Sequence, residues 1–447
     1  MNRRVLNIVT ATSAAVVCSS AFAQPFLSFD PRSMGMGGAG VAVARPATAS
    51  FFNPALLSLP REGDDFALTI PYVGARVRDP DNFSDSIDST QSAINKLDAT
   101  ITFVEANPTE VSNFTDLVRD FGAMNNELKR LSDKPLSGDI GLGIAGGVPG
   151  KTIGIGAYVE GHGVISGVAS YSAVDQVLVD GLISDAATLD NCVNDIINCA
   201  TTPPTLNTIT VDDPSNPTAI QVNFDPNENL TSTADGRGVG VSEAGISLSH
   251  AFTHFALGVT PKFVRVDTFD YQANVDTADA DNFDASDYSK KYSDFNLDVG
   301  IAKTFGDSAH VGLVIKNLLS QEYDTAQKER LSAALYDKRG GAIELNPQVR
   351  AGAAYELSWV TLATDLDLTK NKSFGITKDS QYFSLGAEFD PIKFLLLRVG
   401  YRADLVDSGA SVLTAGLGFA LFGTHFDIAV AGNDNEVGGA LQFGIAF

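Results

Sequence analysis

The C-terminal third of the chain alternates between apolar residues and small or polar residues. In the final eight residues, ALQFGIAF, the apolar positions are Leu441, Phe443, Ile445 and Phe447. A period of two residues predicts a strand whose two faces meet different surroundings. In a membrane barrel the apolar face contacts lipid and the other face lines the lumen.

The same alternation occurs in segments spread along most of the chain. It predicts fourteen strands at 65–77, 138–148, 152–167, 239–251, 253–267, 291–305, 308–317, 347–357, 359–369, 381–389, 393–403, 411–421, 424–432 and 437–447. Most of these segments have the roughly 9–11 residues that a tilted strand needs to cross a bilayer. The predicted fold is therefore all-β, a transmembrane antiparallel β-barrel.

The predicted lumen face carries charges, which do not suit the dry core of a soluble sandwich. They are Lys262, Asp298, Arg350, Glu356, Asp365, Asp367, Glu388, Arg398 and Arg402. Two interpretations are open. The charges could line a conduction path, or they could form a buried network of ion pairs that supports the wall, since buried charges need partners.

The connections between the predicted strands alternate in length. Very short turns, such as VPGK near Pro149, follow the even-numbered strands, whereas residues 78–137, 168–238, 268–290 and 318–346 form long connections. Outer-membrane barrels show this asymmetry, with short periplasmic turns and long extracellular loops. Both termini are then periplasmic, and Trp359 falls at a short turn, where an aromatic girdle is expected.

The N-terminus predicts export. Arg3 and Arg4 precede a short apolar stretch, and Ala21-Phe22-Ala23 is a small-x-small cleavage site, so residues 1–23 are the predicted signal peptide. No later segment offers about 20 consecutive apolar residues, so a spanning chain must close its backbone hydrogen bonds as a barrel.

The chain is strongly acidic. Its formal charge is −23, and it becomes −25 without the two arginines of the signal peptide. This balance argues against nucleic-acid binding and suits solvated loops, such as the Asp-rich segments 78–88 and 276–287. Within the long loops, residues 109–132 and 173–197 are predicted to be helical, and residues 204–224 to form an extra hairpin.

Few residues indicate catalysis or metal binding. His250 and His254 are four residues apart but flank a predicted tight turn, and His162, His310 and His425 lie in no metal-ligand spacing. Asp279, Asp281 and Asp284 are similar to a calcium loop, but the required Gly and distal Glu are missing. No catalytic signature is present, so we predict no enzyme activity, no metal and no cofactor.

Two further features concern stability and assembly. Cys192 and Cys199 are separated by six residues in an exported segment, which predicts one local disulfide. The terminal aromatic Phe447 resembles the assembly signal of bacterial outer-membrane barrels, so the assembly machinery is an expected partner.

The segment before the first strand is rich in small residues. SMGMGGAG contains Gly35, Gly37 and Gly38, and FFNPALL contains Asn53, Pro54 and Ala55. Glycine permits close backbone packing, and Asn-Pro is a turn signal. Since fourteen strands leave space inside, the segment can enter the lumen as a plug. Its apolar residues Phe51, Phe52, Leu56 and Leu57 could face the wall or a ligand.

These motifs resemble the N-terminal signature of FadL-like outer-membrane proteins, a Gly-rich stretch followed by F-x-N-P-A. Within that superfamily, residues 29–83 look most like proteins labelled conjugal-transfer TraF-like. The resemblance implies a fourteen-stranded barrel with an N-terminal hatch (residues 24–62, before a barrel of residues 63–447). It also implies diffusion of hydrophobic molecules. Only Gly35, Gly37, Gly38, Asn53, Pro54 and Ala55 carry over from the family motif.

The leading functional hypothesis is therefore a passive outer-membrane channel for a hydrophobic ligand, in contact with outer-membrane lipid. The alternative is a structural, secretion-associated or conjugation-associated barrel whose loops bind a partner. An apolar pocket beside the hatch would favour the first hypothesis, and loss of mating without loss of uptake would favour the second.

Overall fold

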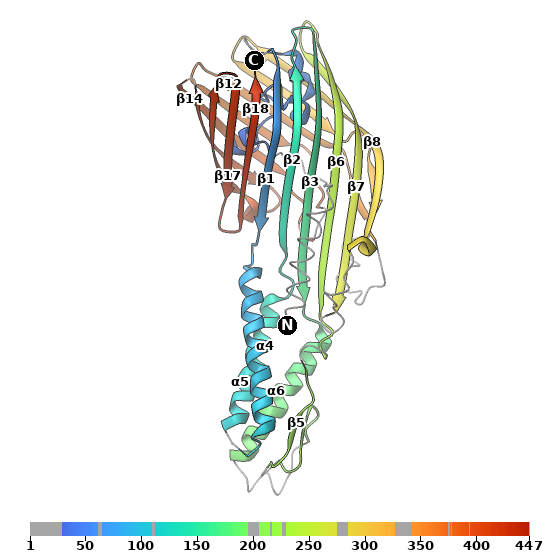
Figure 1. Ribbon diagram of the computed structural model, residues 1–447, viewed down its shortest axis with the longest axis vertical. Helices are drawn as coiled ribbons and strands as arrows, with labels where there is room; N and C mark the ends of the chain where they lie inside the picture. Colours follow the sequence, from blue (N-terminus) through green and yellow to red (C-terminus); the bar gives the residue numbers. More distant parts are fainter. Residues whose placement is uncertain are drawn as a thin grey trace.

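Fourteen antiparallel strands close into one barrel in the computed structural model (Figure 1). The structure describes residues 29–60, 65–109, 112–194, 205–214, 217–225, 229–274, 285–326, 342–373, 376, 378–392 and 394–446. The predicted signal peptide, Cys199, Phe447 and the Asp279–Asp284 segment lie outside these residues.

All fourteen predicted strands are confirmed. The first six of the barrel are β1 (Ala67–Arg78), β2 (Leu136–Val148), β3 (Ile153–Ser170), β6 (Thr233–Ala251), β7 (Ala256–Asn274) and β8 (Ser289–Phe305). The other eight are β9 (Ala309–Lys316), β12 (Gln348–Glu356), β13 (Val360–Asp367), β14 (Tyr382–Ile392), β15 (Leu395–Asp404), β16 (Val412–Leu421), β17 (Thr424–Gly432) and β18 (Glu436–Ala446).

The ring closes where β1 pairs with β18, from Ala67 opposite Ala446 to Arg78 opposite Glu436. The register of β1 shifts between Thr69 and Tyr72 against both of its neighbours. Pro71 lies inside this shift. Proline has no N–H to donate to a ladder, so in a strand paired on both sides it is accommodated at a bulge.

The alternation produces two chemically different faces, as predicted. Apolar side chains point outward, and Leu413, Val430 and Val437 are 68%, 62% and 67% exposed. Trp359, in the short turn between β12 and β13, is also exposed and stacks on Phe389. A belt of exposed apolar side chains around a closed barrel is the surface that lipid requires.

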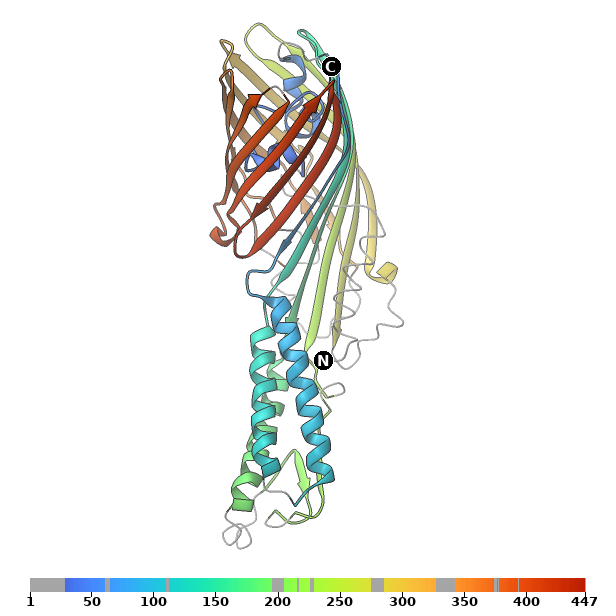
Figure 2. The same cartoon turned by 60° about the vertical axis from the view of Figure 1, so that its left-hand side comes forward.

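The two halves of the barrel differ in length. Strands β3, β6, β7 and β8 contain 17 to 19 residues, whereas β9 and β13 contain 8. The long strands continue past the barrel toward a group of helices, which is clearest in Figure 2. On the side of the helices, the barrel wall therefore extends further along the long strands β3, β6, β7 and β8 than along the short strands β9 and β13.

The helices form a separate core at this end. They are α4 (Phe83–Ala106), α5 (Ser112–Leu131) and α6 (Ala173–Asn194), accompanied by the hairpin β4 (Ile209–Val211) and β5 (Ile220–Val222). Helix α5, helix α6 and the β4–β5 hairpin confirm the three predicted loop elements. Among the described residues, no helix is long and apolar enough to cross a membrane.

Helix α4 and a second hairpin were not predicted. The Asp-rich segment 78–88 was expected to be a loop, but α4 begins inside it because Asp79 caps the helix, accepting hydrogen bonds from the backbone N–H of Phe83 and Ser84. The helical spacing of its buried residues Ile87, Ile94 and Leu97 is masked by acidic and small neighbours. Strands β10 (Gln321–Asp324) and β11 (Ala342–Leu345) pair only with each other.

Asp120 makes an acid-sensitive contact in the helical core. Burial would raise the pKa of Asp120, but hydrogen bonds from Arg119, Lys96 and Thr100 outweigh it and lower this pKa to about 2. The stabilisation is complete above the ordinary pKa of 3.8 and is lost as the pH falls through 2.

We expect Asp120→Asn to destabilise the helical core by about 1–2 kcal/mol at pH 7, because exposed partners screen the interaction. Hydrogen exchange of the α4 and α5 amides, corrected for intrinsic rates, should show this loss. The wild-type protein should lose the same protection only between pH 4 and 2. Asp98→Asn, on the exposed face of α4, is the control, and an equal effect of both variants would contradict the assignment.

The loop asymmetry predicts the orientation in an outer membrane. A membrane-impermeant maleimide should label Ser92→Cys, on α4, on intact cells. It should label Lys151→Cys, in the turn between β2 and β3, only after the outer membrane is permeabilised. The reverse pattern would show that the helices face the periplasm.

Candidate functional site

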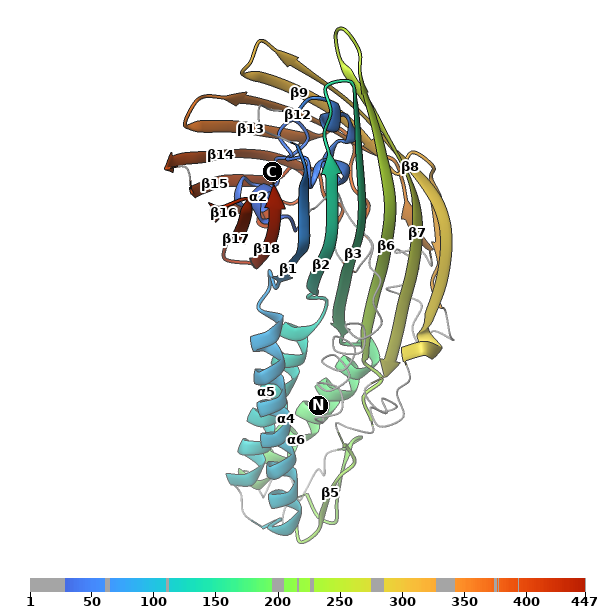
Figure 3. The same ribbon diagram turned by 45° about the horizontal axis from the view of Figure 1, so that its top comes forward.

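The N-terminal segment, residues 29–60, packs against the inward faces of the barrel strands (Figure 3). It contains α2 (Pro31–Gly35), α3 (Ala49–Phe52) and the short helix η1 (Pro54–Ser58). Nearly all of its residues are buried. Small residues and turns dominate the segment, so it follows the wall closely without forming a long helix.

The Asn53-Pro54-Ala55 motif docks against β7, β8 and β9. The Asn53 side-chain amide donates to the carbonyls of Val41 and Ile301, both at 3.1 Å, and its Oδ1 accepts from the N–H of Ala55 at 3.1 Å. One buried side chain thus links two parts of the segment to the wall. The Pro54 ring, at the first position of η1, needs no hydrogen-bond donor there.

Glycines in the wall make room for this motif. A Cβ on Gly300 would lie 2.0 Å from Asn53 Oδ1, one on Gly258 would lie 2.4 Å from the Ala55 nitrogen, and one on Gly312 would lie 2.6 Å from the Val41 carbonyl oxygen. All three positions face the lumen from neighbouring strands. The wall is therefore shaped to receive the segment.

The Gly-rich stretch makes a second contact, with β14 to β16. Gly37 has φ +72°, and a Cβ on it would lie 2.5 Å from the Tyr401 carbonyl oxygen, so both conformation and space require glycine. Its N–H donates to Thr414 Oγ1 at 3.0 Å, while the Thr414 hydroxyl donates to the Gly35 carbonyl at 3.1 Å. Gly38 also has a positive φ, of 96°.

Charged groups fasten the segment to the wall. Arg32 makes a two-pronged contact with Glu388, with both nitrogen–oxygen distances at 2.9 Å. Glu388 also accepts from Arg398 at 2.7 Å, and Arg398 reaches Asp427 at 2.6 Å. Asp365 accepts the backbone N–H of Gly40 and Val41 at 2.8 and 3.0 Å. The segment and the wall therefore provide hydrogen-bond partners for each other's buried polar groups.

The remaining predicted lumen charges are also paired. Lys262 lies 2.9 Å from Glu243 and 3.0 Å from Asp298, Arg350 lies 2.5 Å from Asp367, and Arg402 lies 2.6 Å from Glu436. Glu356 lies 3.7 Å from His310. The ion-pair interpretation is thus favoured over free charges along a path. Sequence analysis missed Arg32, Glu243, Asp427 and Glu436, because strand register and ring closure decide which charged groups meet.

Most apolar side chains of the segment pack on the wall. The centroid of the Phe51 ring lies 5.4 Å from that of Tyr72 and 5.0 Å from that of Tyr158. Leu57 covers Gly154. Phe52 covers Gly40 within the segment. Leu56 differs, since it lines a cavity.

Two cavities lie on opposite faces of the segment. The helix-side cavity has about 390 Å³ of empty space and is lined by Phe29, Met34, Arg76 and Arg402, among others. The turn-side cavity, near the short turn between β8 and β9, has about 380 Å³ and is lined by apolar residues such as Leu56, Leu59 and Val311, together with Lys303, Thr304 and His310. Both volumes include some open solvent. The segment separates the two cavities.

The other candidate residues are dispersed. His250 and His254 lie at the turn between β6 and β7, and His162 packs edge-on against Phe29. Within the described ranges, no group of three or more His, Cys, Asp or Glu is arranged to hold a metal ion. Cys192 is disulfide-bonded, while its predicted partner Cys199 lies outside the described residues.

The docking geometry makes a sharp prediction for Gly300→Ala. The added methyl group would meet Asn53 Oδ1, so the segment or strand must shift, at a cost of about 1–3 kcal/mol. Limited proteolysis should cut residues 29–60 faster in this variant, while heat-modifiability shows an intact barrel. Gly138→Ala is the matched control, because its Cβ would meet only ordinary contacts at 3.7 Å and beyond. Equal protection in both variants would refute the docking role of Gly300.

The fold is similar to those of solved outer-membrane channels. The TodX ΔS2S3 mutant monoaromatic hydrocarbon channel matches with a TM-score of 0.50 and 11% identity, over 93% of this chain and 98% of that chain. The Ralstonia pickettii toluene transporter TbuX has a TM-score of 0.49 and 11% identity, over 94% and 99%. A Pseudomonas aeruginosa FadL homologue has a TM-score of 0.47 and 11% identity, over 95% and 99%.

At this identity the structural likeness concerns the fold alone. No curated protein matches the chain in sequence. A family model does match, over residues 50–367, which is well over half of the 447 residues and includes the Asn53-Pro54-Ala55 motif. The chain therefore belongs to the family described as F plasmid transfer operon, TraF, protein, and has the FadL-like barrel fold.

Proposed function

We propose that the protein is an outer-membrane channel for hydrophobic small molecules, and that the N-terminal segment is the plug that closes it. The observation that carries this proposal is the pair of cavities separated by the segment inside a closed barrel. A solute crossing the lumen would have to pass the segment, so passage requires the segment to shift.

The apolar part of the turn-side cavity supports an apolar solute. Alanine, proline, leucine and valine side chains dominate it, and Leu56 contributes an apolar surface from the plug itself. Lys303, Thr304 and His310 add polar groups at one side of the cavity, so its apolar part is the side formed by the plug and Val311. The channels with a similar fold are named for toluene and monoaromatic hydrocarbons, which agrees with such a solute.

Asn53 makes one of the contacts through which the plug could be released. Asn53 supplies three of the hydrogen bonds that join residues 41, 55 and 301, and it does so from a fully buried position. Loss of the amide leaves the Val41 carbonyl without this donor, which destabilises the closed arrangement. The rest of the barrel does not depend on this contact, since the strand ladder is complete without it.

A second candidate function follows from the family match. The family description refers to a plasmid transfer operon, and the helical core projects from one end of the barrel as a surface that a partner could contact. A role in transfer or secretion would use this surface and would not require a passage through the lumen.

Replacing both Asn53 and Pro54 with Ala should loosen the plug. In planar bilayers we expect larger or noisier conductance than in the wild-type protein, and faster cellular uptake of the hydrophobic dye N-phenylnaphthylamine. Asn95→Ala, on the exposed face of α4, is the control. A folded double variant with unchanged conductance and uptake would refute the gating role. If removal of the whole protein lowers mating but leaves uptake unchanged, that result would favour the transfer function.

A further inference from the structure

A small hairpin lies inside the barrel mouth on the side of the helices. Its strands, β10 and β11, come from the connection between β9 and β12. Three of its side chains, Tyr323, Ile343 and Leu345, are buried in one apolar cluster with inward-facing valines of β3, β6 and β7. The next inward positions toward the plug carry the charges of Glu243 and Lys262. The valines therefore form an apolar patch on a polar wall, and the hairpin covers it.

A second connection reaches the same part of the wall. Ile376, between β13 and β14, is buried, and its N–H donates to Ser166 Oγ at 2.6 Å. Ser166 is the next inward position after Val164, which belongs to the valine patch. In the strand order β13 and β3 lie on opposite sides of the ring. The chain therefore spans the mouth above the plug.

The hairpin depends on its docked face for stability. Four residue pairs join β10 to β11, and in one of them Glu322 lies directly opposite Glu344, with both side chains exposed. Like charges at directly opposed positions destabilise a strand pair, and a two-stranded hairpin on its own is at best marginally stable in water. Loss of the contacts with the valines would therefore release the hairpin.

The chain enters the hairpin through a turn at Asn317, directly after β9 ends at Lys316. Asn317 is buried and has φ +56°, a left-handed conformation that asparagine adopts more readily than most residues. Its N–H donates to Asp298 Oδ1 at 2.8 Å. Leu319 bonds the Asn296 side chain twice, through its N–H at 3.1 Å and its carbonyl at 2.9 Å. Two side chains of β8 thus set the direction of the chain into the hairpin.

Asp298 connects this turn to the plug through buried side chains. The same Oδ1 atom lies 3.0 Å from Lys262 Nζ, and Lys262 donates to both oxygens of Glu243 at 3.0 and 2.9 Å. Glu243 also accepts from the Tyr158 hydroxyl at 3.1 Å. The Tyr158 ring packs edge-on against Phe51 of the plug, with 5.0 Å between the ring centroids. This first branch is therefore continuous from the turn to Phe51.

A second branch ends at the neighbouring residue of the same turn. Lys316 Nζ lies 3.7 Å from Glu160 Oε1, and the Tyr72 hydroxyl donates to Glu160 Oε2 at 2.9 Å. The Tyr72 ring also packs edge-on against Phe51. The charged side chains of both branches are buried, and a buried charge that loses its partner is strongly destabilising. A shift at either end therefore disturbs one shared set of contacts.

We propose that the β10–β11 hairpin is a second closure of the lumen, and that its docking is coupled to that of the plug through these two branches. Release of the hairpin moves Asn317 and Lys316, which changes the contacts of Asp298 and Glu160 and loosens the packing of Phe51. The coupling is reciprocal, so release of the plug also loosens the hairpin. This inference rests on the proposed channel function for its role in passage, but the coupling itself does not depend on transport.

Hydrogen exchange of the full-length barrel in a neutral detergent tests the coupling. Tyr323→Ala removes the largest side chain that docks on the valines. It should speed exchange in residues 318–324 and, at a distance, about threefold or more in plug residues 49–58. Phe51→Ala should in turn speed exchange in residues 318–324, because coupling is reciprocal. Ile343→Ala makes a smaller change on the same face and keeps the test valid if Tyr323→Ala folds poorly.

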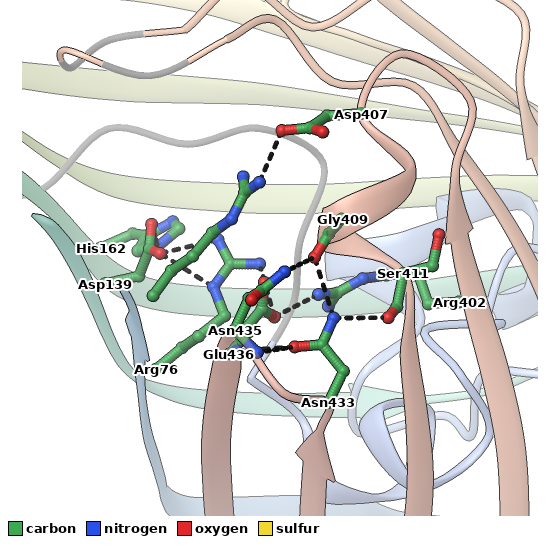
Figure 4. Close-up of polar contacts among 11 residues, drawn as sticks. Arg76, Asp139, His162, Arg402, Asp407, Gly409, Ser411, Asn433, Asn435 and Glu436 are labelled. Carbon is green, nitrogen blue, oxygen red and sulfur yellow. Dashed lines mark hydrogen bonds and ion pairs between the residues drawn. The ribbon is translucent and has the colours of Figure 1, made fainter. Parts of the chain in front are cut away.

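A variant of the first branch separates this coupling from general loosening. Glu243→Gln/Lys262→Met/Asp298→Asn removes three charges together, so none of the three is left without its partner. In this background Tyr323→Ala should still loosen the hairpin, while its effect on the plug falls at least about twofold. Arg402→Met/Glu436→Gln is the control, because it neutralises a buried pair outside both branches (Figure 4). The effect on the plug should persist in that background.

Tyr271→Ala is the matched control for the loss of a tyrosine. Tyr271 lies on β7, but its side chain packs in the helical core beside Tyr288, so plug exchange should stay as in the wild type. The proposal is overturned if Tyr271→Ala loosens the plug equally, if the hairpin loosens without the plug, or if the branch variant leaves the effect on the plug intact. Conductance and dye uptake are separate measurements, so failure of the channel function would be distinguishable from failure of the coupling.

Discussion

Closure of the strand ring is the constraint on which the rest of the molecule depends. Backbone N–H and C=O groups cannot remain unpaired in lipid, so a chain that crosses a membrane as strands has to pair every strand on both sides. Here β1 meets β18 to complete the ring, even though Pro71 disturbs the ladder and requires a register shift. Once the ring is closed, alternate residues must face lipid or lumen, and all side chains sort accordingly.

Closure also creates a lumen that fourteen strands cannot fill with their own side chains. The N-terminal segment occupies this lumen. It fits closely because glycines on one side of the contact face backbone or side-chain atoms on the other. Wall glycines such as Gly258 and Gly300 receive the Asn53-Pro54-Ala55 motif, while Gly37 of the segment approaches the backbone of β15. Because the segment also supplies Arg32 to Glu388 and backbone donors to Asp365, plug and wall satisfy each other's polar groups.

Charged side chains are distributed unevenly along the barrel axis. The lumen charges around the N-terminal segment lie in ion contacts, such as Lys262 with Glu243 and Asp298, so they brace the wall. At the mouth, Arg76 pairs with Asp139 and Arg402 with Glu436, while Arg78 and Lys378 both lie close to Asp407. The helical core lies beyond, at the open side of the mouth.

Alternation in the sequence was sufficient to locate all fourteen strands, because a period of two is a local property that survives without knowledge of partners. The small-residue segment and its Asn53-Pro54 turn were visible for the same reason. Helix α4 was missed because acidic residues at its start obscured the apolar spacing, although Asp79 acts there as a cap. The tertiary structure alone decided which charges meet. Arg32 and Glu388 lie 356 positions apart in the sequence. A polar cleft at the barrel mouth likewise brings Arg78 of β1 close to Lys378 of the connection between β13 and β14. Such contacts depend on ring closure and strand register, which no local pattern encodes.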